Sequence, residues 1–183
     1  MAGVPDLIVV TGPPGAGKTR TLAKLFEPSA LDAGDGFFAF IDRGYIAPWA
    51  AEAHHQNEVV VAAAATAAGR LAIGRYTVVY DGVIRPWFLE TFGAVTGLTR
   101  LHYLMLLPSE QVCIDRVRAR VGHGFTDLEA TRHMYREFVG PDIDDRYMMT
   151  RTAPVEAVAS SLCELVLAGM RIWTIDGAAS RPS

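Results

Sequence analysis

The sequence has little cysteine and no long apolar run. Only Cys113 and Cys163 occur among its 183 residues, each in apolar surroundings typical of a helix. We interpret them as reduced, buried thiols and not as a disulfide framework or a metal site. No apolar run approaches the length of a membrane span, and a glycine-rich motif begins so near Met1 that we expect no signal peptide. These features predict a cytoplasmic protein without a membrane partner.

The sequence also lacks a surplus of charge of one sign. Its formal net charge is −3, and both signs are spread along the chain without a basic block. Because nucleic-acid binding relies on clustered basic residues, we expect no nucleic-acid partner and a small-molecule substrate instead. The length predicts a single domain at residues 1–176, followed by a disordered tail at 177–183 that is small and polar.

The most informative motif runs from Gly12 to Thr19. It has the pattern Gly-x-x-x-x-Gly-Lys-Ser/Thr of a phosphate-binding loop, with an apolar run before it and a possible helix start after it. Glycines allow the backbone N–H groups to turn toward phosphate oxygens, and the helix N-terminus adds the positive end of its dipole. The residues expected to bind the phosphates of ATP are Gly12, Pro13, Pro14, Gly15, Ala16, Gly17, Lys18 and Thr19.

Lys18 and Thr19 carry the specific chemistry of this loop. We expect Lys18 to reach the β- and γ-phosphates and the Thr19 hydroxyl to ligate Mg²⁺. A mostly apolar run at 76–80 ends in Asp81, which would hold a Mg²⁺-bound water or bond the Thr19 hydroxyl. A plain Asp-Gly turn is the alternative. Gly82 follows where motor ATPases usually place a Glu, which argues against a hydrolytic engine.

Apolar runs and helical segments alternate along the chain. Strand-like runs lie at residues 7–11, 37–41, 76–80, 101–107 and 146–150. Helical candidates lie at residues 18–26, 54–74, 86–96, 109–121, 127–139 and 155–168. Such alternation indicates an α/β fold in which a five-stranded parallel sheet carries helices on both faces.

Asp42 is the candidate for activating an acceptor. It directly follows the apolar run 37–41, so we expect its carboxylate at the carboxyl edge of the sheet beside the phosphate loop. A carboxylate there would orient an acceptor hydroxyl and take its proton. The alternative is a turn residue, since Asp42-Arg43-Gly44 favours a turn on its own.

An arginine-rich segment precedes two glycines. Arg116, Arg118 and Arg120 occur within a few residues, and Arg116 and Arg120 share one face of a helix. We expect a small lid at about 118–130, from which an arginine neutralises charge on the transferring phosphoryl group. Arg120 is the first candidate and Arg116 the second, whereas an exposed cationic face near a helix C-terminus is the alternative.

Aromatic and polar residues also lie between the second and fourth predicted strands. They are Trp49, His54, His55, Arg85, Trp87 and Phe88. Two interpretations stay open, an acceptor pocket near the strand ends and core aromatics of the helices that they begin.

With the phosphate loop, Asp42, Asp81 and the Arg-Gly lid in this order, the chain resembles a branch of the P-loop kinases. This branch holds chloramphenicol phosphotransferase-like and gluconate/shikimate kinase-like enzymes, within the AAA-type ATP-binding domain family. The resemblance spans about residues 6–176 and implies a three-layer P-loop NTPase fold with strand order 2-3-1-4-5. It also implies that Asp42 matches the base of the chloramphenicol enzymes, that Lys18 and Thr19 match the loop residues, and that Arg120 matches the lid arginine.

We therefore predict a kinase that uses ATP and Mg²⁺ to phosphorylate a hydroxyl of a small metabolite or antibiotic. Its predicted catalytic residues are Lys18, Asp42 and Arg120, its metal residues are Thr19 and Asp81, and Arg116 joins Arg120 at the nucleotide. Two alternatives stay open, a nucleotide switch or ATPase and a nucleoside or nucleotide kinase. The sequence specifies neither the acceptor nor an oligomeric state.

Overall fold

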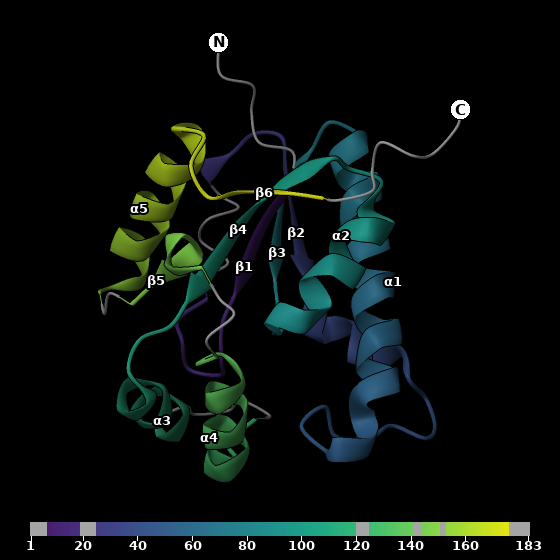
Figure 1. The fold of residues 1–183 in the computed structure, drawn as a ribbon, viewed down its shortest axis with the longest axis vertical. Helices are drawn as coiled ribbons and strands as arrows, with labels where there is room; N and C mark the ends of the chain where they lie inside the picture. Colours follow the sequence, from purple (N-terminus) through teal and green to yellow (C-terminus); the bar gives the residue numbers. More distant parts are fainter. Residues whose placement is uncertain (1–6, 19–24, 120–124, 141–143, 151–152, 176–183) are drawn as a thin grey trace.

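The computed structural model describes residues 7–18, 25–119, 125–140, 144–150 and 153–175. Within these ranges the chain forms a six-stranded sheet with the order β2-β3-β1-β4-β5, and β6 pairs with β4 (Figure 1). The strand pairs β2–β3, β3–β1, β1–β4 and β4–β5 are parallel, whereas β6 runs antiparallel to β4. The predicted parallel order is confirmed, and β6 is an addition that the sequence did not predict.

The strands and helices alternate as expected. The strands are β1 (Leu7–Thr11), β2 (Ser29–Ala33), β3 (Thr77–Asp81), β4 (Arg100–Leu106), β5 (Met148–Met149) and β6 (Ile172–Thr174). The α-helices are α1 (His54–Ile73), α2 (Leu89–Thr96), α3 (Glu110–Arg118), α4 (Leu128–Glu137) and α5 (Val155–Leu167). Short 3-10 helices are η2 (Gly34–Phe40), η3 (Ala51–Ala53), η4 (Pro86–Phe88) and η5 (Asp145–Tyr147). The helix predicted at 18–26 lies largely outside the described residues.

The second strand was predicted wrongly. Residues 37–40 of the predicted strand lie in η2, and the strand that pairs with β3 is Ser29–Ala33. Because β2 is an edge strand that pairs with β3 alone, it needs few apolar side chains. Gly34 ends it in close contact with the sheet, since a Cβ at Gly34 would lie 2.0 Å from the Tyr80 Oη. The apolar pattern of 37–41 therefore belongs to a helical turn after the strand.

Two hydrophobic cores lie on opposite faces of the sheet. Helices α1 and α2 cover one face and α5 covers the other (Figure 1). Successive residues of β1 alternate between them, so that Leu7 and Val9 join the α1 side while Ile8 and Val10 join the α5 side. All four are buried, as expected for the central strand of a parallel sheet covered on both faces.

Side-chain caps explain where two helices begin. The Ser109 hydroxyl accepts from the Val112 N–H at the start of α3, and the Asp127 carboxylate accepts from the Ala130 N–H at the start of α4. Such caps satisfy N–H groups that have no partner inside the helix. The helix starts predicted near Ser109 and Asp127 are confirmed.

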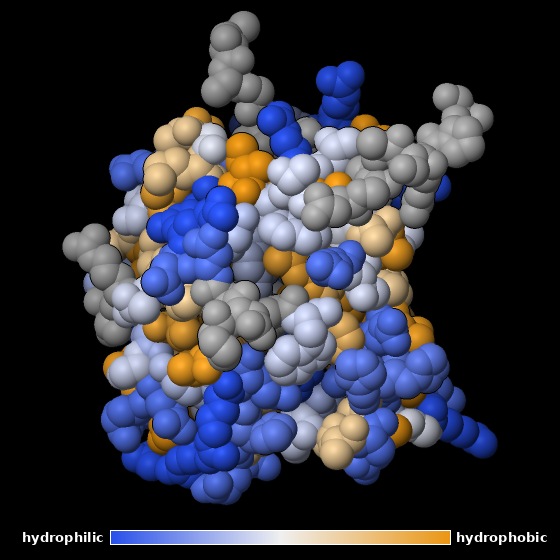
Figure 2. All heavy atoms as spheres, in the orientation of Figure 1, coloured by the Kyte–Doolittle hydropathy of each residue, from blue (hydrophilic) through white to orange (hydrophobic). Residues whose placement is uncertain are grey.

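The two cysteines are free, as expected. Cys113 is buried in the α5-side core, where burial raises the pKa of its thiol to about 11, and Cys163 is half-buried. Figure 2 shows apolar residues on one face of the molecule as small separate islands among polar ones. Within the described parts of the chain, no helix combines the length and the apolar character that a membrane crossing requires.

Helices α1 and α2 approach each other closely at Gly69. A Cβ at this position would lie 2.0 Å from the backbone oxygen of Thr96. A backbone atom cannot swing aside as a flexible side chain would, so only glycine fits this contact.

Replacing Gly69 by Ala therefore tests the helix packing. Alanine has the higher helix propensity, but the steric conflict with Thr96 should dominate and lower the free energy of unfolding by about 1–3 kcal/mol. The matched control is Gly140→Ala, because a Cβ there meets nothing within 4 Å. Urea denaturation should place the control within about 0.5 kcal/mol of the wild type. Equal stabilities of the two variants would contradict the packing described.

Candidate functional site

The glycine-rich loop begins where β1 ends, and Thr11 anchors that end. The Thr11 hydroxyl donates to the Ile84 carbonyl at 3.0 Å and accepts from the Ile84 N–H at 2.8 Å. Both groups are buried, so these two bonds connect the end of β1 firmly to the segment that follows β3.

The loop backbone has the conformation that its glycines allow. Gly12, Gly15 and Gly17 have φ angles of 146°, 81° and 90°, which L side chains rarely adopt. A Cβ would also lie 2.2 Å from the Leu106 oxygen at Gly12 and 2.3 Å from the Cys113 oxygen at Gly15. The loop thus turns tightly against the end of β4 and the start of α3.

The Lys18 side chain folds back onto the start of the loop. Its amino group donates to the Gly12 carbonyl at 2.8 Å and to the Pro13 carbonyl at 3.4 Å. These bonds hold the ammonium charge over the backbone turn that the motif predicts as the phosphate site. Thr19, the predicted metal ligand, lies outside the described residues.

The Arg116 side chain contacts the loop by donating hydrogen bonds to two carbonyl oxygens of the loop. Its Nη1 donates to the oxygens of Gly15 and Ala16 at 3.2 and 3.1 Å. The guanidinium therefore holds the loop to α3, and we interpret it as a residue that supports the phosphate site. Arg118 is exposed and pairs with Asp115 at 3.5 Å, and Arg120 lies outside the described residues.

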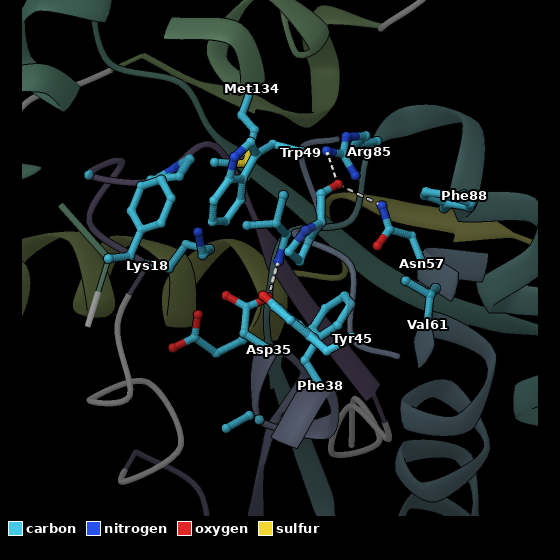
Figure 3. A pocket seen from close by; sticks show the side chains of 18 of the residues that line it. Lys18, Asp35, Phe38, Tyr45, Trp49, Asn57, Val61, Arg85, Phe88 and Met134 are labelled. Carbon is cyan, nitrogen blue, oxygen red and sulfur yellow. Dashed lines mark hydrogen bonds between the residues drawn. The ribbon is translucent and has the colours of Figure 1, made fainter. Parts of the chain in front are cut away.

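Two carboxylates follow the neighbouring strands β3 and β2. Asp81 ends β3 as predicted and lines the same pocket as Lys18. Asp35 lies just after β2, where its Oδ1 accepts from the Val83 N–H at 3.1 Å. Figure 3 shows Lys18 and Asp35 beside one another at one end of the pocket. Parallel strands end at one edge of the sheet, which is why these groups from distant segments meet.

Asp42 does not take the place predicted for it. It follows η2 and not a strand, its side chain is 98% exposed, and its neighbour is Arg43 at 4.0 Å. It is not among the residues that line the pocket. Asp35 takes the position at the end of the second strand, and the signal for it was the sequence Asp32-Ala33-Gly34-Asp35, an acid next to a tight turn.

Asp32 adds a third carboxylate near this edge, inside the protein. It is 5% exposed, and neither of its oxygens has a hydrogen-bond partner in the described structure. Burial raises the pKa of Asp32 to about 6. Burial, together with the charges of Asp35, Asp32 and Asp81, raises the pKa of the nearby Tyr80 phenol well above its usual value.

The pocket has a volume of about 770 Å³, within the range typical of sites for drug-sized ligands. It extends from the loop and the carboxylates to apolar and polar side chains on the far side (Figure 3). Its remaining lining comes from segments far apart in the chain, including Phe38, Tyr45, Pro48, Trp49, Asn57, Val61, Val83, Arg85, Phe88, Phe125 and Met134. Of the aromatic and polar candidates from the sequence, Trp49, Arg85 and Phe88 therefore line the pocket.

Arg85 is fixed in the pocket wall by two partners. Its Nε lies 2.5 Å from Glu137 Oε2, and its Nη2 donates to the Pro48 oxygen at 3.2 Å. The Asn57 amide donates to the same oxygen at 2.7 Å (Figure 3). The side chains of Arg85 and Glu137 are 7% and 21% exposed, so this ion pair is shielded from water.

A phosphate loop directly after the central strand of a parallel sheet defines the P-loop class of α/β proteins. In this chain carboxylates also lie at the ends of the neighbouring strands β3 and β2. No protein-family model matches the chain, and no curated protein matches its sequence. Among solved structures, the Deinococcus radiodurans tunicamycin resistance protein matches with a TM-score of 0.64 and 16% identity, over 87% of this chain and 94% of that chain. Shikimate kinase from Acinetobacter baumannii matches with a TM-score of 0.54 and 19% identity, over 92% of this chain and 96% of that chain. These likenesses show the three-layer P-loop fold.

The contacts of Arg116 predict that it stiffens the loop. Arg116→Ala removes two charge-assisted hydrogen bonds, so stability should fall by about 1–2 kcal/mol and amide exchange should quicken across residues 12–18. Arg118→Ala is the matched control, because it changes the same residue type on the same helix without touching the loop. Hydrogen-exchange mass spectrometry measures the protection of the loop amides. Equal protection in both variants would contradict the stiffening role of Arg116.

The raised pKa of Asp32 predicts that the stability of the protein falls as the pH rises from about 4 to 6. In this window the folded protein keeps a proton that the unfolded chain has released, so the free energy of unfolding decreases as the pH rises. Above pH 6 the loss stays constant, at most about 3 kcal/mol. Asp32→Asn should flatten this dependence in urea denaturation without nucleotide or metal. Parallel pH profiles of the variant and the wild type would show that Asp32 is not responsible.

Proposed function

We propose that the chain is a phosphotransferase that uses ATP and Mg²⁺ to phosphorylate a hydroxyl group of a small molecule. The observation that carries this proposal is a single pocket lined by the phosphate loop, by Asp35 and by Asp81. A donor site and a carboxylate beside open space for a second molecule are what transfer to an acceptor requires. The solved neighbours, described as a shikimate kinase and a tunicamycin resistance protein, support a small-molecule ligand over a polymer or a membrane.

The loop and Asp81 would hold the donor. ATP with Mg²⁺ would supply the phosphoryl group and neutralise part of its charge. The backbone N–H groups from Gly15 to Lys18 suit phosphate oxygens, and the Lys18 ammonium lies on the same turn. Asp81, together with Thr19, has the oxygen donors that Mg²⁺ prefers.

Asp35 would orient the acceptor. The Val83 N–H fixes one oxygen of its carboxylate, which lines the pocket beside the loop. From there it can accept the proton of a bound hydroxyl as the oxygen attacks. Arg120 remains our proposal for a lid arginine that neutralises charge during transfer.

A transfer screen with γ-labelled ATP tests the proposal. Antibiotics, sugars, sugar acids and nucleosides are incubated with the protein and Mg²⁺, and a phosphorylated product is detected by its mass. We expect at least one hydroxyl compound to be labelled, and Lys18→Ala to abolish the labelling. Phosphate release that is independent of every acceptor would favour an ATPase or switch instead.

Asp35 and Asp42 provide a matched pair of variants. With an acceptor from the screen, Asp35→Asn should lower kcat by about 10²–10⁴-fold, because the general base is lost while the shape is kept. Asp42→Asn should stay within about twofold of the wild type, since this exposed side chain lies outside the pocket lining. The reverse ranking would return the base role to Asp42.

A further inference from the structure

The end of the pocket that faces away from the phosphate loop combines apolar side chains with two polar ones, Arg85 and Asn57 (Figure 3). Val61, Phe88 and Met134 line the pocket and are buried, each at most 5% exposed. They come from α1, η4 and α4, so three separate elements contribute apolar side chains to the pocket. Figure 3 shows Val61 and Phe88 on one side of the cavity and Met134 on another. Buried apolar side chains on two sides of a cavity favour a ligand that buries apolar surface of its own.

Aromatic rings line further parts of the pocket, and Figure 3 shows Phe38 and Tyr45 near Asp35. Trp49 and Phe125 pack edge to face at 5.2 Å, and Phe38 packs edge to face against Tyr45 at 6.4 Å. All four line the pocket. Edge-to-face packing fixes the orientation of each ring, so these rings present rigid apolar surfaces to a bound molecule.

The far end of the pocket offers no unpaired cation among the described residues that line it. Arg85 is the basic side chain there, and both Glu137 and the Pro48 carbonyl already bind its guanidinium. An acidic ligand would have to displace Glu137 or share the guanidinium with it, beside a second carboxylate. Both routes are costly, because a displaced Glu137 loses its partner and two neighbouring carboxylates repel each other.

From these rings and this neutralised arginine we infer that the acceptor is a neutral molecule with an aromatic or apolar body, and not a small hydroxy acid. The body packs between Phe38 and Trp49, and its hydroxyl lies toward Asp35. The position of the reactive hydroxyl rests on the proposed function, whereas the preference for a neutral apolar body rests on the pocket alone.

Three probes test the inference with the wild-type protein. They are biphenylmethanol, the same compound carrying a carboxylate on its far ring, and shikimate, each titrated by calorimetry at neutral pH. We expect biphenylmethanol to bind at least about tenfold more tightly than either acid, which corresponds to about 1.4 kcal/mol. Equal or tighter binding of an acid, or no binding of biphenylmethanol up to its solubility limit, would overturn the inference.

Variants then assign the preference to residues. Phe38→Ala should weaken the binding of biphenylmethanol at least about fivefold. Phe40→Ala should change this affinity less than about twofold, because Phe40 is 80% exposed and outside the pocket lining. Glu137→Gln frees Arg85, so it should narrow the gap between the neutral probe and its carboxylate analogue. An unchanged gap in a Glu137→Gln protein with wild-type circular dichroism would contradict the role of the ion pair.

Failure of this inference is distinguishable from failure of the proposed function. If the protein transfers the label from ATP to hydroxy acids and to no neutral compound, it is a phosphotransferase and the inferred acceptor is wrong. If biphenylmethanol binds in the Phe38-dependent way but no compound is ever labelled, the apolar ligand site stands and the phosphotransferase proposal is wrong.

Discussion

The close approach of the phosphate loop to the sheet is the constraint on which the rest of the site depends. Gly12 passes so near the Leu106 carbonyl that no Cβ fits between them, and Gly15 is equally close to Cys113. The loop can take this path because β1 is central, with β3 on one side and β4 on the other. The same placement brings the strand ends of β3 and β2, with their carboxylates, to the mouth of the loop.

The pocket therefore has two chemically different ends. Near the loop, the charges of Lys18, Asp35 and Asp81 suit a phosphoryl donor with its metal ion. At the far end, Val61 and Phe88 lie on the same side as an arginine whose charge Glu137 already neutralises (Figure 3). Under the proposed function, one end would carry the reaction and the other would recognise the acceptor.

The phosphate loop and the parallel α/β sheet could be predicted from a short contiguous motif and an alternation of elements, whereas the strand order followed from the resemblance to the P-loop kinases. Asp81 was also placed correctly, since β3 is apolar and central. Asp35 was missed because β2 is a weakly apolar edge strand, and the stronger pattern at 37–41 drew the prediction to Asp42. The far end of the pocket depends on packing between distant segments, which no local pattern in the chain contains.

A crystal structure with Mg²⁺ and a non-hydrolysable ATP analogue tests the central claim most directly. The account predicts that the phosphates lie on the backbone N–H groups from Gly15 to Lys18, that the metal ion lies near Asp81, and that the terminal phosphate faces Asp35 across the pocket. A nucleotide bound elsewhere, or a terminal phosphate turned away from Asp35 toward solvent, would contradict it.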